Sequence, residues 1–167
     1  NSGNRGIWAD VKKDQQIFRV YVVHLASISF QPEDYSFLKD VKDDLNKGKD
    51  VTSSKRIVKK LKNAFVKMSE LIKILQKELS SCTIPYIVMG DFNDTPVSFA
   101  ISQISKNLKN GFAEKGSGLG ITYNGDFPNF QIDYIFTTPH FDFKDYRIIK
   151  KDFSDHYPVT STVTLVN

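Results

Sequence analysis

Residues 87–96, IVMGDFNDTP, constrain the fold more than any other stretch of the chain. The stretch opens with an apolar run that is typical of a strand buried on both faces of a sheet. Asp91, Asn93 and Asp94 follow directly, so the buried strand is predicted to end in two carboxylates and an amide. An Asx turn is one explanation of these polar side chains, and a functional site is the other.

Two strands and one long helix are predicted before this stretch. Residues 6–13 and 16–27 are rich in β-branched and aromatic side chains and are separated by polar residues, which predicts paired strands. Residues 31–48 begin with a proline and acids and end with a glycine, which predicts a short exposed helix. Between residues 54 and 80, apolar side chains recur at steps of three and four, the period of one helical face.

The first half of this long helix carries six cations and no acid. One interpretation is a nucleic-acid-binding surface. We favour the other, in which the charges form the solvated back of a helix whose apolar stripe covers a sheet.

The second half of the chain predicts a helix over residues 98–112, ended by Gly111, and then a loop rich in glycine and aromatic residues. Strands are predicted at residues 132–139, 146–153 and 154–166, the last with alternating apolar positions. Because strands and helices alternate and strands close the chain, the sequence predicts one domain with a mixed α/β layered fold.

Composition places few limits on function. The 167 residues contain 23 Lys and Arg against 19 Asp and Glu, and the net charge of +4 favours anionic partners without indicating a dedicated nucleic-acid-binding domain. Cys82 is the single cysteine, which excludes an internal disulfide, and without a Cys/His array no structural zinc site is expected.

Polar functional groups gather at the ends of the predicted strands. In layered α/β folds, strand ends and the loops after them form the ligand crevice, so we expect these groups to converge. The candidates are His24, Asp91, Asn93, Asp133, Asp155 and His156.

Three of the candidates are hard oxygen donors. The carboxylates of Asp91 and Asp155 and the amide oxygen of Asn93 suit Mg²⁺, or alternatively Mn²⁺, better than zinc or copper. An oxygen-rich metal site is therefore expected.

The two histidines suit work on a phosphate. His24 and His156 are expected to act as proton donors or as cations against a phosphate, and Asp133 is expected to fix one imidazole and raise its pKa. Together with the oxygen donors, they fit metal-assisted attack of water on a phosphate ester.

Each candidate has a structural explanation as well. A salt bridge would satisfy Asp133, His24 would serve as a core histidine, and His156 would shape a turn. Tyr123, in the glycine-rich loop, either lines a substrate crevice or packs under the loop.

Four segments in this order resemble the endonuclease/exonuclease/phosphatase superfamily: VYVVHLAS, IVMGDFNDTP, QIDYIF and SDHYPV. The resemblance implies a sandwich of mixed, mainly antiparallel sheets flanked by helices, built from two similar halves. It also implies that residues 1–167 are a single, N-terminally truncated domain comprising the second half and the last strands of the first.

The resemblance assigns roles at matching positions. Asp91 resembles the carboxylate that orients or deprotonates the attacking water, and Asn93 the amide that steadies the phosphoryl transition state, with both contacting a second metal ion. Asp155 resembles a ligand of the main Mg²⁺. His156 resembles the catalytic histidine held by a carboxylate, here Asp133.

His24 resembles the histidine that contacts the scissile phosphate, and Asn93 and Tyr123 complete the expected substrate-binding residues. The implied reaction is in-line hydrolysis by a metal-dependent phosphoesterase, without a covalent intermediate. Phosphodiesters of DNA or RNA are the first candidate substrates. An inositol-phosphate phosphatase or a sphingomyelinase-like phospholipase is the alternative.

Two departures from the family pattern stand out. No Gln-Glu pair precedes residue 6 to supply the main metal-binding Glu, so the chain alone is expected to bind metal poorly. A non-enzymatic function is therefore kept as a further alternative, in which the chain is an inactive fragment or a binding module. Gln131 stands where many relatives carry Arg.

The expected partners are the phosphate-ester substrate and the missing N-terminal half, with no obligate protein partner. The localisation of the protein stays open.

Overall fold

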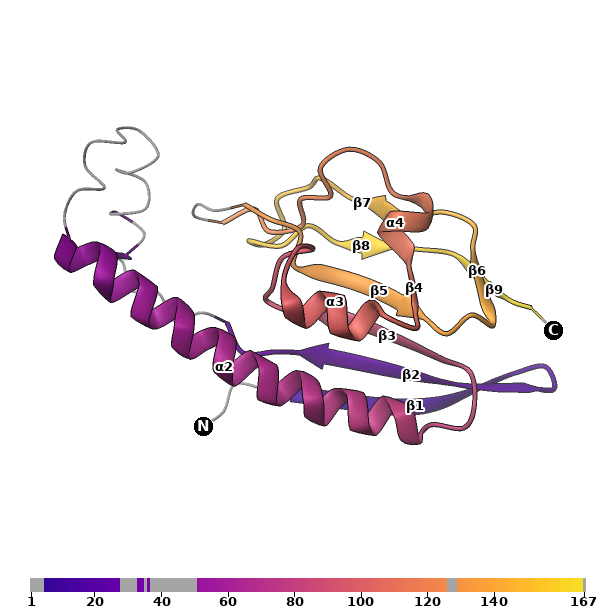
Figure 1. Ribbon diagram of the computed structural model, residues 1–167. Helices are drawn as coiled ribbons and strands as arrows, with labels where there is room; N and C mark the ends of the chain where they lie inside the picture. The colour runs from indigo at the N-terminus through magenta and orange to yellow at the C-terminus, as the bar shows by residue number, and fades with distance from the viewer. Residues whose placement is uncertain (1–4, 28–32, 35, 37–50, 126–128, 167) are drawn as a thin grey trace.

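The structure is a computed structural model that describes residues 5–27, 33–34, 36, 51–125 and 129–166. Five strands pair in the order β1-β2-β3-β5-β4 (Figure 1). Their bounds are β1 Arg5–Lys13, β2 Gln16–His24, β3 Tyr86–Asp91, β4 Lys109–Asn110 and β5 Asp133–Thr137. Only β2 and β3 are parallel, so the sheet is mixed and mainly antiparallel, as expected.

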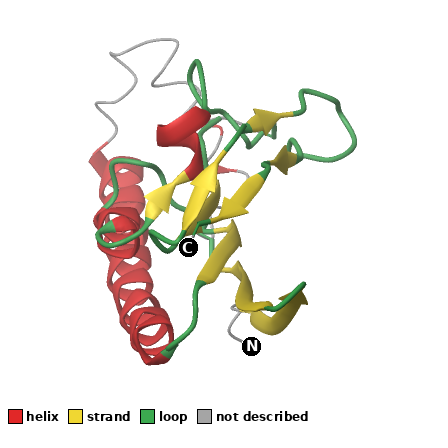
Figure 2. Ribbon diagram, turned by 90° about the vertical axis from the view of Figure 1, so that its right-hand side faces the viewer, coloured by secondary structure: helices red, strands yellow, loops and turns green. Residues whose placement is uncertain are grey.

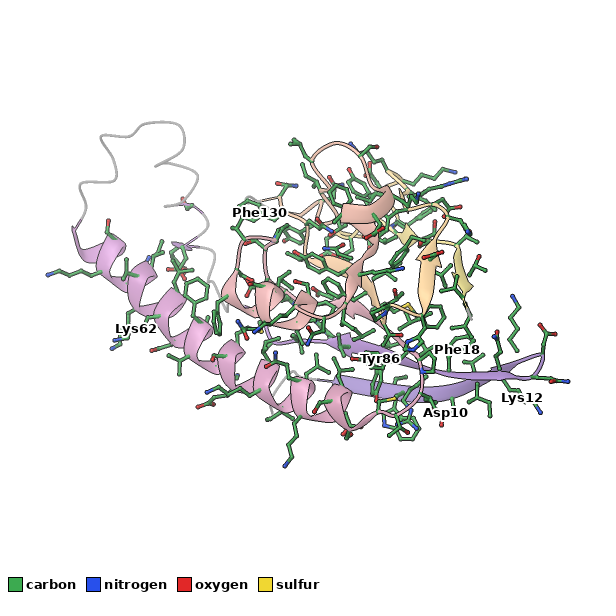
Figure 3. All side chains as sticks on the ribbon, turned by 45° about the vertical axis from the view of Figure 1, so that its right-hand side comes forward. Asp10, Lys12, Phe18, Lys62, Tyr86 and Phe130 are labelled. Carbon is green, nitrogen blue, oxygen red and sulfur yellow. The ribbon has the colours of Figure 1, made fainter. Side chains whose placement is uncertain are left out.

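The first two strands form the predicted hairpin. They pair from Arg5 opposite His24 to Lys13 opposite Gln16, and Asp14 makes the tight turn with a φ of 56°. The hairpin extends beyond the rest of the sheet, where Asp10 and Lys12 are exposed (Figure 3). Successive side chains of β2 point to opposite faces, so one face of the hairpin can join the core while the other stays open.

A single long helix, α2 (Val51–Ser81), covers one face of the sheet together with the short helix α3 (Phe99–Ser105) (Figure 2). This is the helix predicted over residues 54–80. Its apolar stripe joins the core, while Lys62 lies on its outer side (Figure 3). The main core cluster consists of Tyr21, Val23, Leu25, Met68, Ile72, Leu79, Val88, Phe92, Ala100, Ile101, Ile104, Tyr134 and Phe136.

The opposite face of the sheet is covered only in part. Phe18 packs edge-on against Phe141 there, with ring centroids 5.6 Å apart. Towards the carboxyl end of β2 the same face is open, with Ile7 73% and Val22 41% exposed. The expectation of a central strand buried on both faces is therefore wrong for the second half of β3, where Met89 and Gly90 are only half-buried.

The helix predicted over residues 98–112 is shorter than expected. Ser98 caps its start by accepting a hydrogen bond from the N–H of Ile101 at 3.1 Å, and it ends at Ser105. The chain then pairs with β5 as β4, and Gly111 begins helix α4 (Gly111–Lys115) instead of ending α3. A Cβ at Gly111 would lie 2.6 Å from the Phe143 ring, so glycine is required here by close packing.

Two short antiparallel pairs close the chain. Strand β6 (Phe141–Phe143) pairs with β9 (Val163–Leu165), and β7 (Arg147–Ile148) pairs with β8 (Val159–Thr160). The single strand expected over residues 154–166 is thus two strands, although burial alternates along residues 159–165 as predicted. The helix expected over residues 31–48 lies almost wholly outside the described residues.

None of the helices in the described part of the chain combines the length and the apolar character that crossing a membrane would require.

Gly90 allows β2 and β3 to approach closely just before they end. Its φ is +135°, and a Cβ at this position would lie 2.0 Å from the carbonyl oxygen of Val23. An L side chain would suffer both backbone strain and a clash with main-chain atoms that cannot move independently.

Gly90→Ala should therefore lower the free energy of unfolding by at least about 2 kcal/mol. The matched control is Gly6→Ala, because a Cβ there would find its nearest neighbour at 3.8 Å. Urea unfolding of both variants measures the difference. An equal, small effect in the two variants would contradict the close approach of the strands at Gly90.

Candidate functional site

Strand register places three of the candidate residues in one row across the sheet. His24 lies opposite Asp91 in the parallel pair of β2 and β3, and Asp91 lies opposite Asp133 in the antiparallel pair of β3 and β5. Neighbouring residues in register point to the same face, so the three side chains share the open face of the sheet. The expected convergence of these residues is therefore observed.

Asp91 and Asn93 form one hydrogen-bonded unit. The N–H of Asn93 donates to Asp91 Oδ1 at 2.7 Å, and Asn93 Nδ2 donates to Asp91 Oδ2 and to the Leu25 carbonyl oxygen, both at 2.8 Å. Asn93 adopts a φ of 51°, which asparagine tolerates better than most residues. The Asx turn considered for this segment is present, and it fixes the carboxylate of Asp91 within the row.

His24 is the most exposed member of the row. Its Nε2 lies 3.5 Å from Asp91 Oδ2, and its side chain is 60% exposed. His24 is therefore no core histidine, and its ring is open to a ligand approaching this end of the sheet.

His156 reaches the same end of the sheet from the loop before β8. Its Nδ1 lies 2.9 Å from Asp133 Oδ2, as the proposed pairing of these residues requires. The Tyr123 ring packs against the His156 ring with centroids 5.5 Å apart and planes at 72°, and the two residues form a β-bridge. Tyr123 thus flanks the site, where it contacts His156 directly.

The electrostatics of the row follow from burial and from this pairing. Burial raises the pKa of the Asp91 carboxyl; Asp133 adds to the increase, while the Asn93 N–H and both histidines oppose it. The hydrogen bond to Asp133 raises the pKa of His156 above its ordinary value, although burial opposes the shift. Asp91 is therefore a stronger base than an exposed aspartate, and His156 holds its proton to higher pH.

Asp155 is placed differently from the other candidates. It precedes His156 and is exposed, and its carbonyl oxygen accepts the N–H of Asn124 at 2.7 Å. Its carboxylate influences His156 electrostatically, but no hydrogen bond or ion pair joins it to Asp91 in the described residues.

The candidate residues offer the oxygen atoms that Mg²⁺ prefers, but their side chains do not gather around one point in the described structure. Among the described residues, no three His, Cys, Asp or Glu side chains gather closely enough to hold a metal ion. The candidate donors Asp91, Asn93 and Asp155 are all oxygen ligands, however, and Mg²⁺ in proteins often takes only one or two carboxylates and keeps several waters.

Sequence reasoning missed two contributors to the site. Gly90 sets the close approach of β2 and β3 beside Asp91, and a glycine inside an apolar strand run is itself a signal of close backbone contact. The carbonyl oxygen of Leu25 orients the amide of Asn93, and a main-chain acceptor leaves no signal in a sequence.

Comparison with protein families confirms the resemblance. The model of the endonuclease/exonuclease/phosphatase family matches residues 69–156, more than half of the chain. The chain therefore belongs to this family, whose members hydrolyse phosphoester bonds. A comparison with curated protein sequences found no match.

Solved structures share the fold. A mannosyl-6-phosphatase from Bacteroides thetaiotaomicron matches with a TM-score of 0.62 at 21% identity, over 96% of this chain and 57% of that protein. An endonuclease/exonuclease/phosphatase family protein from Bacteroides vulgatus matches with a TM-score of 0.58 at 19% identity, over 96% and 55%.

The human Nocturnin catalytic domain, solved with a bound sulfate, matches with a TM-score of 0.58 at 18% identity, over 96% of this chain and 53% of that domain. The chain thus spans a little over half the length of these structures.

Asp133→Asn should lower the pKa of His156 towards its ordinary value, because the variant removes the charged acceptor that favours the imidazolium. The chemical shifts of the His156 ring, followed by NMR across a pH titration, measure the change. Asp142→Asn is the control, since Asp142 pairs with Lys109. An unchanged His156 titration in Asp133→Asn would contradict the pairing.

The pairing of Asp133 with His156 also predicts that the loss of folding stability in Asp133→Asn depends on pH. A histidine whose pKa is raised by folding stabilises the fold fully below its unfolded-state pKa, and this contribution disappears as the pH rises through the raised value. The stability lost in Asp133→Asn should therefore be larger on the acidic side of that window than on the alkaline side. Denaturant unfolding at both ends of the window tests the sign.

Proposed function

We propose that this protein is a metal-dependent phosphoesterase that hydrolyses phosphodiester bonds, with DNA or RNA as the first candidate substrates. The observation that carries the proposal is the row of His24, Asp91 and Asp133, joined by His156 through its 2.9 Å contact with Asp133. Membership of the family supports phosphoester hydrolysis as the reaction class.

In the proposed reaction, Asp91 acts on the attacking water. Its carboxylate is held by two bonds from Asn93, and its pKa is raised mainly by burial. A fixed carboxylate with increased proton affinity is suited to orient a water and accept its proton. Both amide hydrogens of Asn93 are engaged, with Asp91 Oδ2 and with the Leu25 carbonyl oxygen, so the proposed contact of Asn93 with a phosphate oxygen would replace one of these two bonds.

The histidines are proposed to act on the charge of the phosphate. The raised pKa of His156 keeps the ring cationic to higher pH, and Asp133 fixes the ring through Nδ1, which leaves Nε2 for the substrate. His24, which is exposed beside Asp91, is proposed to contact the scissile phosphate. Positioned donors of this kind stabilise the charge that develops in phosphoryl transfer.

Asp91 and Asn93 are proposed to contact a second metal ion. Asp155 is proposed to hold the main Mg²⁺, which would supply positive charge to the phosphate when bound. We further propose that a carboxylate from outside residues 1–167 completes this donor set. The length of the matching structures supports that proposal, because the chain spans little more than half of them. On this view, residues 1–167 by themselves are inactive.

Phosphomonoester hydrolysis is the second candidate. The mannosyl-6-phosphatase among the matching structures favours a sugar or inositol phosphate as the alternative substrate. The phosphate-handling row would serve either reaction, since substrate choice depends on the loops around it.

His156→Ala and Asp91→Asn, each in the full-length protein, should lower the turnover number by about 10²-fold or more, the usual contribution of a positioned acid or base. Hydrolysis of an aryl phosphodiester with Mg²⁺ measures the loss, and circular dichroism checks folding. The controls are His140→Ala and Asp14→Asn, because both residues are exposed and lie at turns away from the row. Near-normal turnover in both site variants would remove the mechanism.

A substrate panel separates the two candidate functions. Duplex DNA, single-stranded RNA, an aryl phosphodiester, inositol phosphates and mannose 6-phosphate are tested with Mg²⁺ and again with a chelator. Diester hydrolysis that the chelator abolishes supports the leading proposal. Hydrolysis of monoesters alone supports the second, and full activity in chelator contradicts metal dependence.

A further inference from the structure

Thr122 is a completely buried polar residue in the loop between α4 and β5. Sequence reasoning gave this threonine no role. A buried hydroxyl requires hydrogen-bonding partners, so its contacts show what it holds in place.

The hydroxyl of Thr122 takes the place of a neighbouring strand at the start of β5. Strand β4 pairs with β5 only at Phe136 and Thr137, so the first residues of β5 have no strand partner on that side. There Thr122 Oγ1 accepts hydrogen bonds from the N–H of Ile132 at 3.0 Å and of Asp133 at 3.1 Å. The second of these bonds is made to the residue that holds His156.

The main chain of Thr122 holds the other partner of that contact. Its carbonyl oxygen accepts the N–H of Tyr157 at 2.7 Å, directly after His156. On the other side, the N–H of Thr122 donates to the Phe130 carbonyl oxygen at 3.2 Å. One residue is thus bonded to both segments whose side chains meet at 2.9 Å, Asp133 from the sheet and His156 from the loop.

The segments are further joined by the residues after Thr122. Asn124 donates its N–H to the Asp155 carbonyl oxygen at 2.7 Å, and Tyr123 packs against the His156 ring. The loop of residues 122–124 therefore runs alongside residues 155–157, while only the Thr122 hydroxyl reaches from this loop to the Asp133 N–H.

We propose that Thr122 is a positioning residue that sets Asp133 against His156 through its hydroxyl group. Without that oxygen, two N–H groups at the start of β5 lose their acceptor, and the Asp133 carboxylate is no longer held in register with the His156 ring. The effect on turnover rests on the function proposed above, whereas the effect on the Asp133 to His156 contact does not.

The protein contains a matched control for this proposal. Thr137 lies at the other end of β5 and is also completely buried, but its hydroxyl has no hydrogen-bond partner among the described residues. Thr137→Val and Thr122→Val therefore remove the same group at the same burial, the first at the end of β5 and the second from the loop residue bonded to its start. Only the second change removes an acceptor that serves the main chain.

The experiment compares Thr122→Val, Thr122→Ser and Thr137→Val in the full-length protein. The first readout is the tautomer of neutral His156 at alkaline pH, taken from the ¹⁵N shifts of its ring, because a bond to Asp133 holds the proton on Nδ1. The second is hydrogen exchange at the Ile132 and Asp133 amides. The third is the turnover number and KM for an aryl phosphodiester.

In Thr122→Val we expect a mixture of His156 tautomers, faster exchange at both amides, and a turnover number lower by about 100-fold with KM little changed, the scale expected for a misplaced catalytic group. Thr122→Ser should keep the Nδ1-protonated tautomer, and Thr137→Val should match the wild type in all three readouts. If Thr122→Val does not fold, Thr122→Cys, with its weakly accepting sulfur, is measured against the same criteria.

An unchanged His156 tautomer in a folded Thr122→Val or Thr122→Cys variant would overturn the proposal, as would an equal loss in Thr137→Val. The two proposals fail separately. If the wild-type protein hydrolyses none of the phosphate esters tested, the proposed function is wrong, while the tautomer and the amide exchange still decide the role of Thr122.

Discussion

The register of three strands is the constraint on which the candidate site depends. Because β2, β3 and β5 are aligned so that His24, Asp91 and Asp133 lie opposite one another, three polar side chains occupy one end of a mainly apolar sheet face. A slip of one residue would turn each side chain to the other face, into the core under α2. The packing that fixes the register, centred on the buried ring of Phe92 between Tyr134 and Phe136, therefore also fixes the chemistry.

Placement at the edge of the core gives each member of the row a different environment. Asp91 is close enough to the core for burial to dominate its pKa, whereas His24 extends into solvent. The pKa of His156, which joins the row through Asp133, is raised by that partner against the opposing effect of burial. One row thus supplies a carboxylate with raised proton affinity and a stabilised imidazolium, a division of properties that acid–base chemistry uses. The open apolar face beside the row, at Ile7 and Val22, leaves the site accessible from this side of the sheet.

The sequence predicted the structure best where the local residue pattern and the tertiary contacts of that segment favour the same element. Alternation and β-branched content predicted the hairpin, apolar periodicity predicted α2, and polar residues at strand ends predicted the convergence of His24, Asp91, Asp133 and His156. Prediction was wrong where tertiary contacts override local preference. Gly111 resembled a helix end but begins α4, because its missing side chain makes room for Phe143. The second half of β3 resembled a strand covered on both faces, but Met89 and Gly90 are only half-buried, because an apolar run does not show which other segments pack on it. Thr122 carried no signal, since a threonine before a tyrosine in a loop is ordinary until its main-chain partners are known.

The parallel pairing of β2 with β3 has a consequence for how the protein acquires its site. Every other pair in the main sheet is antiparallel, but β2 and β3 can meet only after the chain between them, α2 included, has folded back across the sheet. Such a pairing requires the entropy of a long loop to be lost before the stabilising contacts between the two strands form, and contacts between residues far apart in sequence slow folding. His24 and His156, near opposite ends of the sequence, join the same end of the sheet through Asp91 and Asp133 only after that closure. We therefore expect the geometry of the row to form late in folding and to report on the completeness of the whole sheet more sensitively than helix content does.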